Sequence, residues 1–110
     1  MADQDVESSG NVFADLGFKN ADQELLKAKL TLEIHLRLKA LGLSQTEAAQ
    51  LLGTTQPQIS ALLRLRPVSI SIGRLMEFLT ILGQDVEISV TPSTSADGGK
   101  LSFRSTAEAA

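Results

Sequence analysis

The chain has 110 residues, 43% of them apolar and 21% charged, and a formal net charge of −3, which is an ordinary composition for one small globular domain. It has no cysteine, which excludes disulfide scaffolds and thiolate zinc sites, and its single histidine, His35, leaves almost nothing for a metal site or an acid–base pair, so we expect no metal and no cofactor. No apolar run reaches the ~20 residues of a membrane span and no secretory signal opens the chain, so we expect a cytoplasmic protein. The motifs GxGxxG, GKS and HExxH are absent from the sequence, so we do not expect an enzyme.

The acidic charge lies mainly at the two ends of the chain. Residues 1–20 hold four acidic residues and one basic residue, and residues 84–110 hold four acidic and two basic residues. Residues 21–83 hold seven basic and five acidic residues, so the middle of the chain is mildly positive. The negative overall charge therefore does not exclude a phosphate-binding surface on this middle part.

Residues 1–20 are predicted to form a partly disordered N-terminal arm, because the first eleven residues are small and polar. Large apolar side chains follow within residues 12–18, among them Phe13, Leu16 and Phe18. Exposed apolar side chains of this kind favour aggregation, so we expect the arm to pack on the next helix or on a partner protein.

A long helix is predicted from its N-cap, Asn20, to about Leu41, where Gly42 ends it. The leucines alternate as in a strand, but the length, the lack of Gly and Pro and the content of Leu, Ala, Lys and Glu favour a helix. Its apolar residues form two opposite stripes: Leu26, Leu30, Ile34, Leu38 and Leu41, and Leu25, Ala28, Leu32 and Leu36. One stripe is enough for a domain core, so the second would meet the arm, a second subunit or another protein, unless a larger core surrounds the helix.

Two short helices are predicted on either side of Gly53, which supplies a turn residue with positive φ. Ser44 and Glu47 have the spacing of a capping box and open the first helix. Thr55 caps the second helix, which tolerates a proline in its first turn. The predicted bounds are 45–52 for the first helix and 56 to about 64–67 for the second.

The two short helices have the pattern of a helix-turn-helix, in which a steep crossing requires a small contact residue, here Ala49. The second helix would then present short polar side chains at its start, which suit base edges in the major groove of DNA. The predicted base-reading residues are Thr55, Gln56, Gln58, Ser60 and Ala61. The alternative is an ordinary helical hairpin with solvated Gln and Thr side chains.

Phosphate contacts are predicted beside these residues. The first short helix begins with Gln45 and Thr46, where backbone N–H groups and the helix dipole attract phosphate. Arg64 and Arg66 follow the second short helix and can reach the DNA backbone, and Thr54 is assigned to the same group.

A fourth helix is predicted over residues 72–82, between its cap Ser71 and Gly83. With it, the predicted core comprises Leu30, Ile34, Leu38, Leu41, Ala49, Leu52, Ile59, Leu62, Leu75, Phe78, Leu79 and Leu82.

Residues 85–91 alternate strictly between polar and apolar types and predict a strand with Val86, Ile88 and Val90 on one face. An isolated strand leaves its backbone groups unpaired, so we predict antiparallel pairing with the same strand of a second copy, in a homodimer. Residues 92–110 are predicted to form a flexible tail, in which 101–104 is a weaker candidate for a second strand.

The segment SQTEAAQLLGTTQPQISALL, residues 44–63, resembles the Cro/C1-type (XRE) helix-turn-helix family. The segments SSGNVFADLGF, NADQELLKAKL and RLMEFLTILGQDVEI are similar to a HigA-type antitoxin subfamily of these regulators, over roughly residues 8–90. The resemblance implies an all-α, lambda-repressor-like bundle of four or five helices over residues 21–91, with the C-terminal strand used in dimerisation. Relatives often have Gly where this chain has Leu65, so its linker over 65–70 is expected to run differently.

Two binding functions follow. One is a sequence-specific repressor that binds a palindromic operator in double-stranded DNA as a dimer and autoregulates its own operon. The other is an antitoxin that neutralises a RelE/HigB-like RNase toxin, which would contact Phe13, Leu16, Phe18, Leu32 and Leu36. Residues 45–64 favour DNA binding and do not decide between the two functions.

Overall fold

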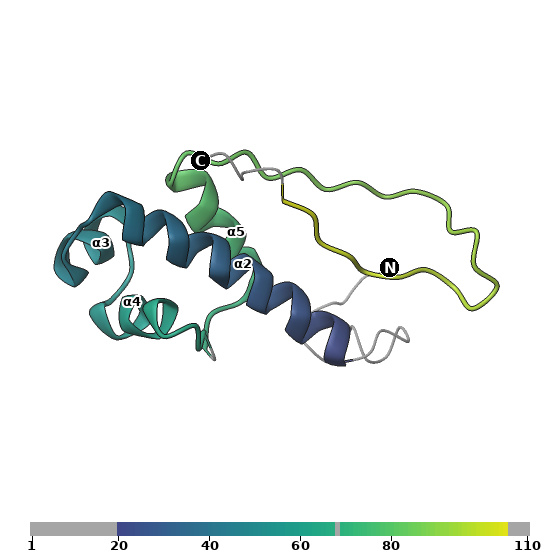
Figure 1. The fold of residues 1–110 in the computed structure, drawn as a ribbon, viewed down its shortest axis with the longest axis horizontal. Coiled ribbons are helices and arrows are strands. Elements are labelled where there is room, and N and C mark those ends of the chain that lie inside the picture. The colour runs from purple at the N-terminus through teal and green to yellow at the C-terminus, as the bar shows by residue number, and fades with distance from the viewer. Residues whose placement is uncertain (1–19, 68, 106–110) are drawn as a thin grey trace. The chain divides into compact units, whose positions relative to one another are not determined.

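The computed structural model describes residues 20–67 and 69–105. Over these residues the chain is all-α, with the helices α2 (Asn20–Leu41), α3 (Gln45–Leu52), α4 (Gln56–Leu63) and α5 (Ile72–Ile81) in that order (Figure 1). Residues Lys27–Ser89 form one compact unit, which holds α3, α4, α5 and most of α2. The flanking residues 20–26 and 90–105 belong to a second unit. None of the described helices is long and apolar enough to cross a membrane.

The long helix α2 has one buried and one open side, as its two apolar stripes predict. Leu30, Ile34 and Leu38 are at most 4% exposed, and their spacing of four residues places them on one face. The fully buried Thr31 donates its hydroxyl hydrogen to the Lys27 carbonyl oxygen at 2.7 Å, so its polar group is satisfied. On the other side, Leu25, Leu32 and Leu36 are 55%, 44% and 53% exposed. We call these three residues the open leucine face.

The predicted caps of α3 are confirmed. The Ser44 hydroxyl accepts a hydrogen bond from the Glu47 backbone N–H at 3.0 Å, and the Glu47 carboxylate accepts one from the Ser44 N–H at 2.9 Å. Gly53 ends the helix with φ +68°, a left-handed conformation that favours glycine because it has no Cβ. These local signals place the start of α3 and the turn after it.

Thr55 and Ser71 cap the next two helices. The Thr55 hydroxyl accepts a hydrogen bond from the Gln58 N–H at 3.3 Å, and the Ser71 hydroxyl accepts one from the Arg74 N–H at 3.1 Å. The predicted starts of α4 and α5 are therefore confirmed.

The core lies inside the unit 27–89 and draws on α2 to α5. Leu38 of α2, Ala48 of α3 and Ile59 of α4 line one shared pocket, and α3 packs against both α4 and α5. The buried apolar residues are Leu30, Ile34, Leu38, Ala48, Ala49, Leu52, Ile59, Leu62, Ile70, Leu75, Phe78 and Leu79.

The predicted core is confirmed except for two leucines at helix ends. Leu41, in the last turn of α2, is 53% exposed, and Leu82, the C-cap of α5, is half-buried. Ala48 and Ile70 are buried but were not predicted. Ile70 immediately precedes the cap of α5, and Leu75 stands at the fourth helical position; this is the spacing of a hydrophobic staple, a signal that could have identified Ile70.

The chain leaves α4 through a Schellman turn centred on Leu65. The Arg66 N–H donates to the Ala61 carbonyl at 2.8 Å and the Leu65 N–H donates to the Leu62 carbonyl at 3.1 Å, which is the bond pair of this motif. Leu65 has φ +60°, in the left-handed region. It thus takes the conformation that glycine favours at such a position.

The strand predicted over residues 85–91 is not formed, and no strand occurs in the described residues. Residues 84–105 have no helix either, and Ile88 and Val90 are 74% and 90% exposed. The physical reason is that alternation sets the direction of side chains, whereas a strand also needs a neighbour for its backbone groups. In the described chain neither 101–104 nor another segment supplies one.

Candidate nucleic-acid interface

α3 and α4 pack against each other on either side of Gly53. Ala49 and Leu52 of α3 and Ile59 and Leu62 of α4 are buried, as the helix-turn-helix pattern predicts. The Thr54 N–H donates to the Ala49 carbonyl at 2.9 Å and closes the turn. The small side chain of Ala49 therefore lies where two short helices approach closely.

The first turn of α4 is the accessible part of that helix. Thr55, Gln56 and Pro57 are exposed, whereas the buried Ile59 and Leu62 fix the opposite side. Of the other predicted base-reading residues, Gln58, Ser60 and Ala61 are half-buried. Helical spacing places Gln56 with Ser60, and Pro57 with Ala61, on the open face of α4.

The structure joins two residues that were assigned to different roles. The side-chain amide of Gln56, a predicted base-reading residue, donates to the Thr46 hydroxyl oxygen at 2.6 Å. Thr46 belongs to the first turn of α3 and is a predicted phosphate contact. The bond links the starts of the two helices across the turn.

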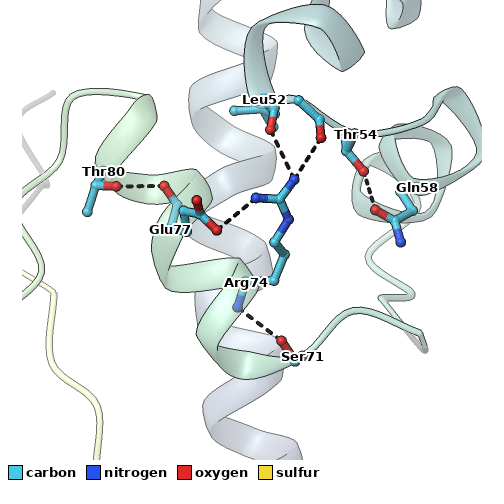
Figure 2. A network of polar contacts seen from close by, with 8 residues as sticks. Leu52, Thr54, Gln58, Ser71, Arg74, Glu77 and Thr80 are labelled. Atoms are coloured by element: carbon cyan, nitrogen blue, oxygen red, sulfur yellow. Dashed lines mark hydrogen bonds and ion pairs between the residues drawn. The ribbon is translucent and has the colours of Figure 1, made fainter.

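A second side-chain bond involves Gln58. The Thr54 hydroxyl donates to the side-chain carbonyl oxygen of Gln58 (Figure 2). One lone pair of this oxygen is engaged, so the amide hydrogens and the second lone pair of Gln58 are the groups it can offer to a ligand.

The residues assigned to phosphate lie around this surface. Gln45 and Thr46 are exposed in the first turn of α3, whose initial N–H groups have no partner within the helix. Arg64, the C-cap of α4, and Arg66 are exposed just after that helix. Thr54 is half-buried in the turn. The set therefore flanks the start and the end of α4.

Arg74, a basic residue that lies close to this surface, was assigned no role from the sequence. Arg74, in the first turn of α5, reaches the turn between α3 and α4 (Figure 2). Its guanidinium donates to the carbonyl oxygens of Gly53 at 2.7 Å and Leu52 at 3.4 Å, and pairs with the Glu77 carboxylate at 2.7 Å. The sequence does contain one signal: Arg74 stands where a capping box would have Glu.

Catalytic and metal-binding groups are sparse in the part of the chain that the structure describes. It holds no group of three His, Cys, Asp or Glu residues that could bind a metal ion. His35 is half-buried, and its Nδ1 atom is buried without a hydrogen-bond partner. The arm residues Phe13, Leu16 and Phe18, predicted to bind a partner, lie outside the described residues.

Comparisons with known proteins agree with this geometry. Residues 12–91 match a family model described as a helix-turn-helix domain. The fold is similar to a solved structure described as an XRE family transcriptional regulator, with a TM-score of 0.72 and 30% sequence identity over 81% of this chain and 100% of that one. Among curated proteins, none matches this chain.

Proposed function

Because the chain belongs to the XRE helix-turn-helix family of DNA-binding transcriptional regulators, we propose that it is a repressor that binds a palindromic operator as a dimer and autoregulates its own operon. The observation that carries the proposal is the exposed start of α4, where Gln56 is held by Thr46. An amide side chain at this place can pair with the N6 and N7 atoms of adenine in the major groove.

The bond between Gln56 and Thr46 makes readout by Gln56 efficient. A long side chain that is ordered before binding loses less conformational freedom when it meets a base edge. Thr46 lies in the first turn of α3, so a phosphate bound at that turn would adjoin the same pair. Backbone positioning and base readout would then be coupled at one point of the interface.

Arg64 and Arg66 supply the contacts that do not depend on sequence. Both are exposed and follow the recognition helix, where they can meet phosphates beyond the base-reading residues. Their charges add affinity for every duplex and make binding sensitive to salt.

The proposed dimer interface is the segment 85–91, which forms neither helix nor strand in the described single chain. The highly exposed Ile88 and Val90 indicate a surface that a second copy would cover. In an antiparallel register centred on Ile88, Val86 faces Val90 of the second copy, and the acidic residues Asp85 and Glu87 face Thr91 and Ser89. A register centred on Val86 would instead oppose Asp85 and Glu87, which is unfavourable. Two-fold symmetry requires a palindromic site, with half-sites about 34–36 Å apart.

Selection of duplexes from a random-sequence pool tests the proposal. The wild-type chain should enrich a palindrome, and that palindrome should occur upstream of the gene that encodes the chain. If the chain bound duplexes from the pool but enriched no sequence among them, the proposed function would be contradicted.

A second candidate function is neutralisation of a toxin, and the open leucine face favours it. Three leucines that are 44–55% exposed on one helix side form an apolar surface suited to a protein partner. The test is co-purification with a small basic RNase-like protein encoded by the neighbouring gene. Leu32→Glu with Leu36→Glu should abolish co-purification and leave DNA binding unchanged; unaltered capture would contradict this role.

A further inference from the structure

We propose that Arg74 is a positioning residue for DNA recognition: its guanidinium fixes the turn between α3 and α4 to α5, and selective binding by α4 depends on this contact. The proposal rests on the proposed function, because it assigns Arg74 to the recognition of DNA. It differs from that function in giving Arg74 a role through the protein and not through contact with the duplex.

The contacts of Arg74 converge on the end of α3. One terminal nitrogen donates to the Gly53 carbonyl at 2.7 Å and lies 3.4 Å from the Leu52 carbonyl oxygen. The other pairs with the Glu77 carboxylate at 2.7 Å (Figure 2). The guanidinium carbon lies 4.6 Å from the ring centroid of Phe78, which is buried in the core. Arg74 thereby connects the turn to the buried side of α5 across 21 residues of chain.

The position of Arg74 in its own helix is electrostatically unfavourable. It is the third residue of α5, close to the positive end of the helix dipole, where acidic residues are preferred. The equivalent position of α3 holds Glu47, which completes a capping box. An arginine here is compensated by contacts outside the first turn, namely the negative C-terminal end of α3 and the Glu77 carboxylate. An arginine at this unfavourable position is therefore consistent with a role for its contact with the turn between α3 and α4.

The shape of arginine suits this contact. A planar guanidinium can donate to the turn with one nitrogen and to Glu77 with the other, while its face lies over Phe78. A lysine ammonium would offer one point of contact and no planar face. The Arg74 side chain is 33% exposed, so solvent screens its interactions only in part.

The turn that Arg74 contacts sets the start of the recognition helix. Gly53 is followed directly by Thr54 and Thr55, and Thr55 caps α4. A shift of Gly53 would therefore move Gln56 relative to Thr46, and with it the group that is proposed to meet a base. Loss of the contact should reduce discrimination between duplexes more than it reduces affinity for DNA in general.

The first test needs no DNA. Arg74→Met keeps the aliphatic stem beside Phe78 and removes the donors, so the hydrogen-bonded amides of Gly53, Thr54 and Gln58 should exchange hydrogen about tenfold faster than in the wild type. Glu77→Gln, which leaves the carbonyl contacts in place, is the matched control and should change exchange less than twofold. Unchanged exchange in Arg74→Met would overturn the proposal.

The second test uses the palindrome selected by the wild-type chain and a scrambled duplex of the same composition. Arg74→Met should lower the ratio of the two affinities about tenfold and leave the dependence on salt unchanged. If Arg74 instead contacted phosphate, both duplexes would weaken equally and the salt slope would fall by about one unit. That second pattern would overturn the proposal.

Arg74→Lys keeps the positive charge of residue 74 and removes the planar guanidinium. It replaces Arg74→Met in both tests if the methionine variant does not fold. It should resemble Arg74→Met in hydrogen exchange and in the affinity ratio, because one ammonium group cannot replace the two terminal nitrogens of the guanidinium. Full recovery with lysine would contradict the role of the guanidinium. A wild-type chain that enriches no duplex would refute the proposed function and leave the exchange test of Arg74 intact.

Discussion

At the scale of single residues, we propose that some residues near the start of α4 contact DNA and that others hold them in place. Gln56 is exposed, its amide donates a hydrogen bond to Thr46, and Gly53 provides the turn before it. Arg74 supports the same turn from α5. Substitutions at these residues should therefore have separable effects on selectivity and on stability.

Gln56→Ala should weaken binding to the selected palindrome by about 1–3 kcal/mol and relax discrimination at one base pair, because a bidentate contact is lost. Competition with duplexes altered at single positions measures both effects. Gln23→Ala removes the same group from α2 and is the matched control, with no expected change. Equal loss on every duplex would show that Gln56 contacts the backbone and not a base.

Leu65→Gly should raise the free energy of unfolding by up to ~1 kcal/mol, since glycine adopts the left-handed conformation without a Cβ penalty. Denaturant unfolding measures the change. Leu51→Gly is the control: that leucine has a similar exposed fraction, 44% against 49%, but lies in α3, and the change should destabilise. A loss of stability in both variants would mean that Leu65 makes contacts that outweigh its backbone strain.

At the scale of the helix, local capping signals predicted where the helices begin and end, whereas tertiary contacts determine which of their side chains are buried. The capping box of Ser44, the left-handed Gly53 and the Ser71 cap depend on neighbours within a few residues, so the sequence could predict them. The exposure of Leu41 depends on whether another element covers the end of α2, and the periodicity of α2 carries no information about that. The exposed start of α4 was predictable, but its bond between Gln56 and Thr46 was not.

Leu62→Ala should lower the free energy of unfolding by about 2–5 kcal/mol, because it leaves a cavity between α4 and the core. This is a large share of the ~5–15 kcal/mol of a typical domain, so the melting temperature should fall clearly. Leu51→Ala, at a site that is 44% exposed, is the control and should change little. A melting temperature unaffected by Leu62→Ala would contradict the core assignment.

The open leucine face predicts protection of the arm. From Leu25 to Leu36 the face extends about 17 Å along α2, and an extended segment of the length of 12–18 spans about 23 Å. The arm precedes α2 directly and can cover this face, so its amides should exchange slowly, either in the free chain or when the candidate toxin is added. Fast exchange across 12–18 in both conditions would remove the arm from the mechanism.

At the scale of the whole molecule, the proposed dimer depends on the segment 85–91, which would bring two recognition helices together. The alternation of its side chains was visible in the sequence, but its partner was not, because pairing partners are not encoded in local periodicity. Arg74 shows the same limit, since its contact joins residues 21 apart. The features that the sequence could not predict are therefore contacts between segments that lie far apart in the chain or in separate chains.

Ile88→Pro should convert the dimer to a monomer, because proline removes a ladder donor from the centre of the proposed pairing. Light scattering measures the mass, and affinity should fall far more for the full palindrome than for a half-site. Lys100→Pro, the control, introduces a proline outside the segment 85–91 and should leave the dimer intact. A dimeric Ile88→Pro variant would place the interface elsewhere, with the open leucine face as the next candidate.

The most direct test of sequence-specific recognition is an equilibrium titration of the wild-type chain against the selected palindrome and a scrambled duplex, repeated at several salt concentrations. The palindrome should bind roughly 10³-fold more tightly or better, and both affinities should fall steeply as salt increases. Equal affinity for the two duplexes at every salt concentration would contradict base readout by α4.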